Sequence, residues 1–85
     1  MDYDTEMSKR VWLAVLVQAF KDFCSLHPKD YASVVRWLGS PGFENTCDMA
    51  DVDEDRVREA FRRLDKFSPA MRKKMLREII RNAGW

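Results

Sequence analysis

Residues 47–61, CDMADVDEDRVREAF, decide the fold of this chain. Two small residues, Cys47 and Ala50, come just before Asp51, and the apolar Val57 follows after a short polar interval. Small side chains allow two helices to pack closely at a steep angle, and a tight connection must then join them. The stretch therefore predicts two short helices that meet at a turn around Asp51 and pack together against a third helix.

Residues 43–64 resemble the DNA-binding helix-turn-helix motif. In that motif the turn position that Asp51 takes here is most often glycine, and the next residue is apolar, as Val52 is. The outward residues of the second helix in the motif lie near base edges and phosphates. The corresponding residues here are Asp53, Glu54, Asp55, Arg58, Glu59 and Arg62. Three adjacent acids would repel phosphates but favour a helix N-terminus, so the implied framework has a reading face that does not suit DNA.

A longer pattern is similar to that of small helical proteins encoded by bacteriophages and prophages of proteobacteria. It consists of Trp37-Leu38-Gly39-Ser40 followed by Phe43, Cys47, Ala50, Val52 and Val57. This resemblance implies a compact helical protein of phage or prophage type. The roles of those proteins are mostly unassigned, so the resemblance bears on gene class rather than on mechanism.

Apolar residues recur at helical spacing on both sides of the opening stretch, and no alternating strand pattern occurs. The predicted helices span residues 5–26, 29–38, 43–50, 54–66 and 70–82. Asp53 is the predicted N-cap of the fourth helix. We predict one all-α domain over residues 1–85, a compact bundle of four to five helices containing the helix-turn-helix-like unit.

The first predicted helix carries more apolar residues than one stripe needs. Its inward stripe is predicted to contain Val11, Val15, Leu16, Ala19, Phe20, Phe23 and Cys24. Trp12 and Leu13 lie beside that stripe, and Met71 and Trp85 lie near the end of the chain. Small domains leave much of their surface exposed, and contiguous exposed apolar side chains mark contact sites. We therefore predict a homodimer whose interface draws on Trp12, Leu13, Met71 and Trp85.

The cysteine, histidine and N-terminal patterns exclude several classes of protein. Cys24, Cys47 and His27 cannot supply the four ligands of a structural zinc site. We expect free buried thiols, with a single disulfide as the alternative. The acidic N-terminus is unlike a signal peptide, and the apolar run 11–20 is too short to span a membrane. The chain is predicted to be cytoplasmic, with no membrane partner, no metal site and no cofactor.

Charge is distributed unevenly along the chain. Residues 1–60 contain seven Lys and Arg against twelve Asp and Glu, a net charge of −5. Residues 61–85 contain eight against two, a net charge of +6. Such a division predicts a basic face for a polyanion or an acidic partner. The residues expected to contact nucleic acid are Arg58, Arg62, Arg63, Lys66, Lys73, Lys74, Arg77 and Arg81.

Two functions of different classes follow from these patterns. The first is a non-enzymatic DNA-binding transcriptional regulator of phage or prophage type, in which the basic residues contact phosphates. The alternative is a phage-encoded inhibitor or adaptor that binds a host protein complex of transcription, defence or CRISPR. Its acidic face would mimic phosphates through Asp48, Asp51, Asp53, Glu54, Asp55 and Glu59. Catalysis is not expected, because no nucleophile pairs with His27 in the sequence.

Overall fold

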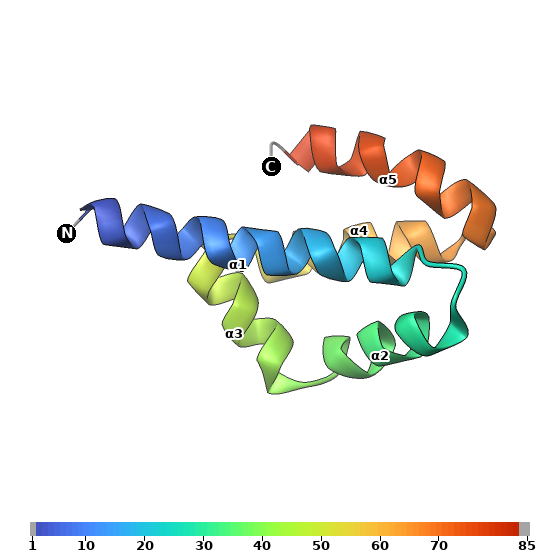
Figure 1. The fold of residues 1–85 in the computed structure, drawn as a ribbon, viewed down its shortest axis with the longest axis horizontal. Coiled ribbons are helices and arrows are strands. Elements are labelled where there is room, and N and C mark those ends of the chain that lie inside the picture. The colour runs from blue at the N-terminus through green and yellow to red at the C-terminus, as the bar shows by residue number, and fades with distance from the viewer. Residues whose placement is uncertain (1, 84–85) are drawn as a thin grey trace.

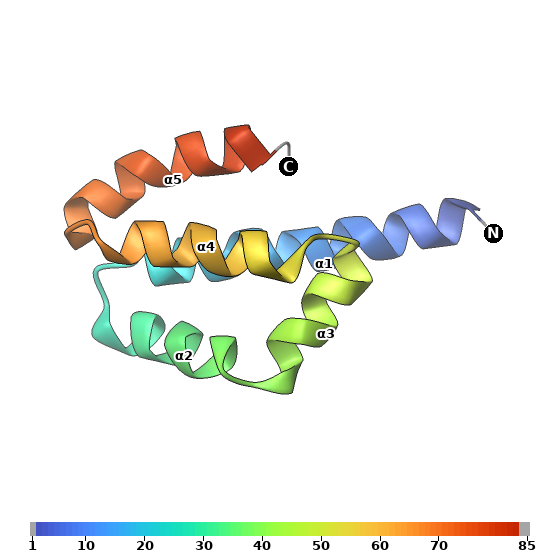
Figure 2. The same ribbon diagram turned by 180° about the vertical axis from the view of Figure 1, so that it is seen from behind.

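The computed structural model describes residues 2–83 and the side chains of residues 7–82. Its helices, in chain order, are α1 (Asp2–Phe23), α2 (Pro28–Leu38), α3 (Pro41–Ala50), α4 (Glu54–Asp65) and α5 (Pro69–Ala83). Helix α1 runs across the front of the molecule in Figure 1, with α5 above it and α2 and α3 below it. Helix α4 lies behind α1 and comes to the front in Figure 2. The prediction of an all-α bundle of four to five helices is confirmed, with five helices in the described residues.

Local sequence signals set the helix starts. Helices α2, α3 and α5 begin at Pro28, Pro41 and Pro69. Proline suits the first turn because its ring fixes a helical φ and its missing N–H has no partner there. Helix α4 begins differently, since the Asp53 carboxylate accepts hydrogen bonds from the backbone N–H of Asp55 at 2.9 Å and of Arg56 at 3.2 Å. The predicted N-cap is therefore confirmed.

Aromatic rings from three helices meet at the centre of the core. Phe61 of α4 stacks on Phe20 of α1, with ring centroids 4.1 Å apart. The edges of Phe23 and Phe43 meet the same ring, with centroids at 5.2 and 6.4 Å. Burying these rings removes large apolar areas from water and fixes how the helices are oriented. Phe61 therefore joins α4 to both α1 and α3.

The inner face of α1 differs from the prediction. Val11 and Val15 are exposed, whereas Trp12 and Leu13 pack against the core beside the buried Leu16. Apolar residues cover so much of this helix that periodicity alone does not choose between neighbouring stripes. Packing against α2, α3 and α5 makes the choice. The prediction was thus wrong for Val11 and Val15, and it placed Trp12 and Leu13 too far from the core.

Both cysteines are free and buried, as predicted. Burial raises the pKa of the Cys47 thiol to about 11, and it also raises the pKa of Cys24 despite the nearby positive charges of Arg72 and Lys73. The charged form of a thiol is disfavoured where water is excluded. Both side chains therefore remain protonated and act as small apolar groups at neutral pH.

The connection between α3 and α4 turns on Asp51, which has a left-handed backbone with φ 58° and ψ 46°. Among the described residues it is the only non-glycine residue with positive φ. Its backbone N–H donates to the Asp48 carbonyl, and the N–H of Val52 donates to the Cys47 carbonyl at 3.0 Å. These bonds close the last turn of α3 and hold a conformation that costs an L-residue energy.

Replacing Asp51 with glycine is expected to raise the free energy of unfolding by about 0.5 kcal/mol, because glycine adopts positive φ without a Cβ clash. Asp51→Ala keeps the clash, so it should be about 1 kcal/mol less stable than the glycine variant. Both variants lose the exposed ion pair with Lys9, so their difference isolates the backbone. Urea unfolding followed by circular dichroism measures both values. An alanine variant as stable as the glycine variant would contradict this account.

Candidate nucleic-acid interface

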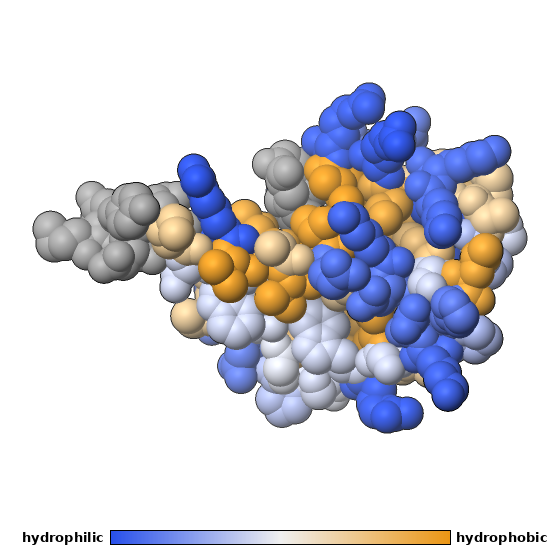
Figure 3. All heavy atoms as spheres, viewed as in Figure 1, coloured by the Kyte–Doolittle hydropathy of each residue, from blue (hydrophilic) through white to orange (hydrophobic). Residues whose placement is uncertain are grey.

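Helices α4 and α5 follow each other along the chain and carry most of the basic residues. Helix α4 ends at Asp65, α5 begins at Pro69, and α5 packs against both α4 and α1. Seven of the predicted basic side chains are exposed on this pair of helices or on the segment that joins them; they are Arg62, Arg63, Lys66, Lys73, Lys74, Arg77 and Arg81. Figure 3 shows hydrophilic side chains along the upper edge of the molecule, where α5 lies.

Most of these exposed cations have no acidic partner. Arg62 pairs with Glu59, at 2.7 Å between Nη1 and Oε2. No other ion pair among the side chains of residues 7–82 involves the exposed set. The six cations without such a pair are Arg63, Lys66, Lys73, Lys74, Arg77 and Arg81, and we call them the basic surface. Their charges are available to an external anion.

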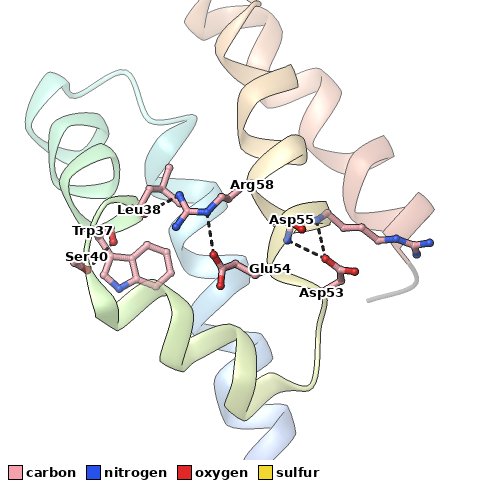
Figure 4. A network of polar contacts seen from close by, with 8 residues as sticks. Trp37, Leu38, Ser40, Asp53, Glu54, Asp55 and Arg58 are labelled. Carbon is pink, nitrogen blue, oxygen red and sulfur yellow. Dashed lines mark hydrogen bonds and ion pairs between the residues drawn. The ribbon is translucent and has the colours of Figure 1, made fainter.

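Arg58 differs from the other predicted phosphate contacts because its side chain turns inward. Its Nε pairs with Glu54 at 3.2 Å, and its Nη1 donates to the carbonyl of Leu38 at 3.0 Å (Figure 4). The guanidinium also lies 4.7 Å from the centroid of the Phe43 ring. These contacts tie α4 to the last residue of α2 and to the core. Arg58 is therefore a structural residue in this fold and not part of the basic surface.

Arg72 repeats the same arrangement one helix later. Its side chain is 12% exposed, pairs with Asp65 at 3.3 Å and donates from Nε to the carbonyl of Leu64 at 3.2 Å. The guanidinium stacks over the rings of Phe23 and Tyr31. The hydroxyl of Tyr31 donates to Asp65 at 2.7 Å, a hydrogen bond that raises the pKa of Tyr31. Arg72 thus holds the start of α5 against α4, α1 and α2.

The predicted acidic face is largely engaged inside the molecule. Asp53 caps α4, and Glu54 pairs with Arg58. Glu59 and Asp51 pair with Arg62 and Lys9. The two remaining members, Asp48 and Asp55, have exposed side chains that make no ion pair among the described residues. Most of the negative charge on this face is therefore balanced by a neighbouring donor or cation.

A groove between α4 and α5 adjoins the basic surface. Its lining residues are Arg56, Glu59, Ala60, Arg63, Phe67, Met75, Glu78, Ile79 and Asn82. Arg56 is exposed here without an ion pair in the described residues, and the sequence prediction missed it. The sequence signal that could have identified Arg56 is its spacing from Arg63. The two residues lie two helical turns apart and therefore stand on one side of α4. Arg56 extends the positive charge of the basic surface along α4.

The described residues predicted for a dimer interface differ in their exposure. Trp12 and Leu13 are partly buried against the core, while Met71 is exposed on α5. Trp85 lies outside the described residues. Helix α1 thus exposes Val11 and Val15, and not the Trp12 and Leu13 side chains that the sequence indicated.

Neither a metal cluster nor a membrane span is found in the described part of the chain. No group of three or more His, Cys, Asp or Glu is placed there to hold a metal ion. None of the helices there combines the length and the apolar character needed to cross a bilayer. Comparison of the chain with protein-family models, with curated proteins and with solved structures found no match in any of the three.

Proposed function

We propose that the protein is a non-enzymatic DNA-binding regulator of phage or prophage type that holds duplex DNA through the basic surface. The observation that carries the proposal is the concentration of six exposed cations on α4, on α5 and in the segment between them, none of which has an ion pair in the described residues. Lysine and arginine that neutralise phosphates release condensed counterions, which is the main source of sequence-independent affinity for DNA. Cations already paired with carboxylates would contribute much less to the affinity for DNA.

The connection of α3 with α4 supports a helix-turn-helix framework for this function. Residues 51–53 join the two helices, and Cys47 and Ala50 are buried where they meet. In Figure 2 α3 lies at a steep angle to α4. The outer face of the first turn of α4 carries Asp55, which opposes its entry into a DNA groove. We infer that this unit serves as a framework and that contact with phosphates comes from α5 and the C-terminal half of α4.

The spacing on α5 suits contacts with a phosphate backbone. Lys74, Arg77 and Arg81 are three and four residues apart and stand on one side of the helix. Contacts of this kind position a protein on DNA without reading bases. The proposal therefore implies similar affinity for duplexes of different sequence.

The phosphate-mimicking inhibitor receives less support. Such a protein needs several unpaired carboxylates on one face, whereas only Asp48 and Asp55 of its six acids lack a partner or a capping role among the described residues. Placing the engaged acids against the basic channel of a host protein would require breaking their present contacts. DNA binding is therefore the function that we propose.

Fluorescence anisotropy of a labelled duplex, titrated at several salt concentrations, tests the proposal. If all six cations meet phosphates, the logarithm of the binding constant should fall with the logarithm of salt with a slope of about −5. A duplex of scrambled sequence should bind within about threefold of the first. Absence of binding at low salt would refute the proposal, and strong preference for one sequence would refute the backbone-only mode.

A further inference from the structure

Helix α1 presents an exposed apolar stripe on the front of the molecule. Met7, Val11 and Val15 are 47%, 58% and 39% exposed. They follow one another at intervals of four residues, and the exposed Ala14 lies beside them, so the four residues share one side of the helix. We call these four residues the α1 stripe. Figure 3 shows hydrophobic side chains gathered along this part of α1.

The α1 stripe continues into a shallow groove between α1 and α2. The groove is lined by Val15, Gln18, Ala19, Asp22, Ser33, Val34 and Trp37. Val15 belongs to both the stripe and the groove. The exposed apolar surface is therefore larger than four side chains, and contiguous surface of this kind marks a contact site.

Two cations border the α1 stripe on the side toward α5. Lys21 lines a pocket together with Lys73 and Leu76 of α5, which places it on that side of α1. Arg10 lies eleven residues before Lys21, about three helical turns, and therefore stands on the same side of α1. Both are exposed. Positive charge thus extends from α5 down to the upper border of the stripe.

We propose that the α1 stripe binds the same stripe of a second copy of this chain, with the two α1 helices antiparallel. The two-fold axis runs perpendicular to α1, in the direction from α1 toward α5. A two-fold contact joins a surface patch to itself, which an apolar stripe without charges inside it satisfies. The partner's α1 lies across the groove, where side chains at the ends of its stripe fill the space beside Trp37.

This axis places the basic surfaces of both copies on one side of the dimer. Helix α5 lies above α1 in Figure 1, so the α5 helices of both copies lie on the same side of the dimer when two copies meet through the fronts of α1. Arg10 and Lys21 of each copy then fill the space between the two basic surfaces. A second copy is favoured as the occupant because it alone doubles the phosphate contacts along one duplex. The choice of axis rests on the proposed function, whereas the contact itself rests on the α1 stripe.

The same arrangement explains why α4 needs no DNA-reading face. Helix α4 lies behind α1 (Figures 1 and 2), whereas Figure 3 shows hydrophobic side chains along the front of α1. In the dimer the two α4 helices therefore face away from each other and cannot enter neighbouring grooves of one duplex. The exposed acid Asp55 at the start of α4 does not meet DNA in this geometry.

Sedimentation without nucleic acid tests the contact. One helix pair is a small interface, so we expect a dissociation constant of about 10–100 μM, measured from about 5 to about 300 μM. Val11→Glu puts a charge inside the contact and should remain monomeric over this range. Val35→Glu is the matched control, since Val35 is 46% exposed on α2 and lines a different groove, toward α4. A wild-type monomer throughout, or equal dissociation of the two variants, would overturn the proposal.

Cross-linking tests the orientation. Val11 lies at the middle of the stripe and Met7 at its end, so in an antiparallel pair only a cysteine at the middle meets its own copy. A short thiol cross-linker should join Val11→Cys chains and leave Met7→Cys chains unjoined, with the native cysteines protected by burial. Equal cross-linking of both variants would overturn the antiparallel arrangement. Salt-dependent DNA binding by a strict monomer would refute the dimer alone, and a dimer without affinity for DNA would refute the proposed function alone.

Discussion

Replacing Phe61 with alanine is expected to lower the free energy of unfolding by about 3–5 kcal/mol. The ring is 2% exposed, stacks on Phe20 and receives the edges of Phe23 and Phe43. Its removal leaves a cavity where three helices meet, and each of the three rings around it loses an aromatic contact. A domain of this size has a total stability near the low end of the usual 5–15 kcal/mol, so much of the variant should be unfolded at room temperature.

Urea unfolding followed by circular dichroism measures this effect. Phe67→Ala is the matched control, because Phe67 is only partly buried beside the groove between α4 and α5. That variant should lose about 1 kcal/mol, since less apolar area returns to water and no closed cavity forms. A loss at Phe61 no greater than the loss at Phe67 would contradict the position we assign to the ring at the centre of the core.

The double variant Lys74→Glu/Arg77→Glu is expected to weaken DNA binding by about 100-fold at moderate salt. Both side chains are exposed on α5 and belong to the basic surface. Reversing their charge removes two phosphate contacts and adds two repulsive groups. The salt slope should therefore fall in magnitude by about 2. Anisotropy titrations of the same duplex, at the salt concentrations used for the wild type, give both numbers.

The control for this variant is Lys29→Glu/Arg36→Glu. It makes the same change in net charge on α2, where both residues are exposed and lie outside the basic surface. Screening limits the effect of charges farther than about 10 Å from the DNA at moderate salt, so the control should lose less than about fivefold in affinity. Equal losses in the two double variants would show that total charge, and not the surface on α4 and α5, determines binding.

The helices of this protein could be predicted from the sequence because the signals that start them are local. A proline in the first turn, or a carboxylate two residues before its N–H partner, acts on its own segment whatever the rest of the chain does. Pro28, Pro41, Pro69 and Asp53 all mark the starts that the structure shows. The buried small residues Cys47 and Ala50 were likewise predicted from spacing alone.

The candidate site was harder to predict because residues far away in the sequence determine whether a charged side chain is free to bind a ligand. Arg58 reaches a carbonyl twenty residues earlier in the chain, and Arg72 stacks on rings of α1 and α2. Nothing in the local sequence separates them from Lys74 or Arg77. The outward stripe of α1 was missed for a related reason, since Val11 and Trp12 are equally apolar and only the packing of other helices decides which faces inward.

Lysine cannot replace arginine at Arg58 and Arg72, whereas the two amino acids are interchangeable at exposed positions of the basic surface. Arg58 and Arg72 each bind a backbone carbonyl, a carboxylate and an aromatic ring at the same time. Only a planar guanidinium with several donors satisfies all three, whereas the ammonium group of lysine is a compact point charge. At Lys74 or Arg77 a phosphate needs only positive charge. Exchange between these two amino acids therefore distinguishes cations that maintain the architecture from cations that serve recognition.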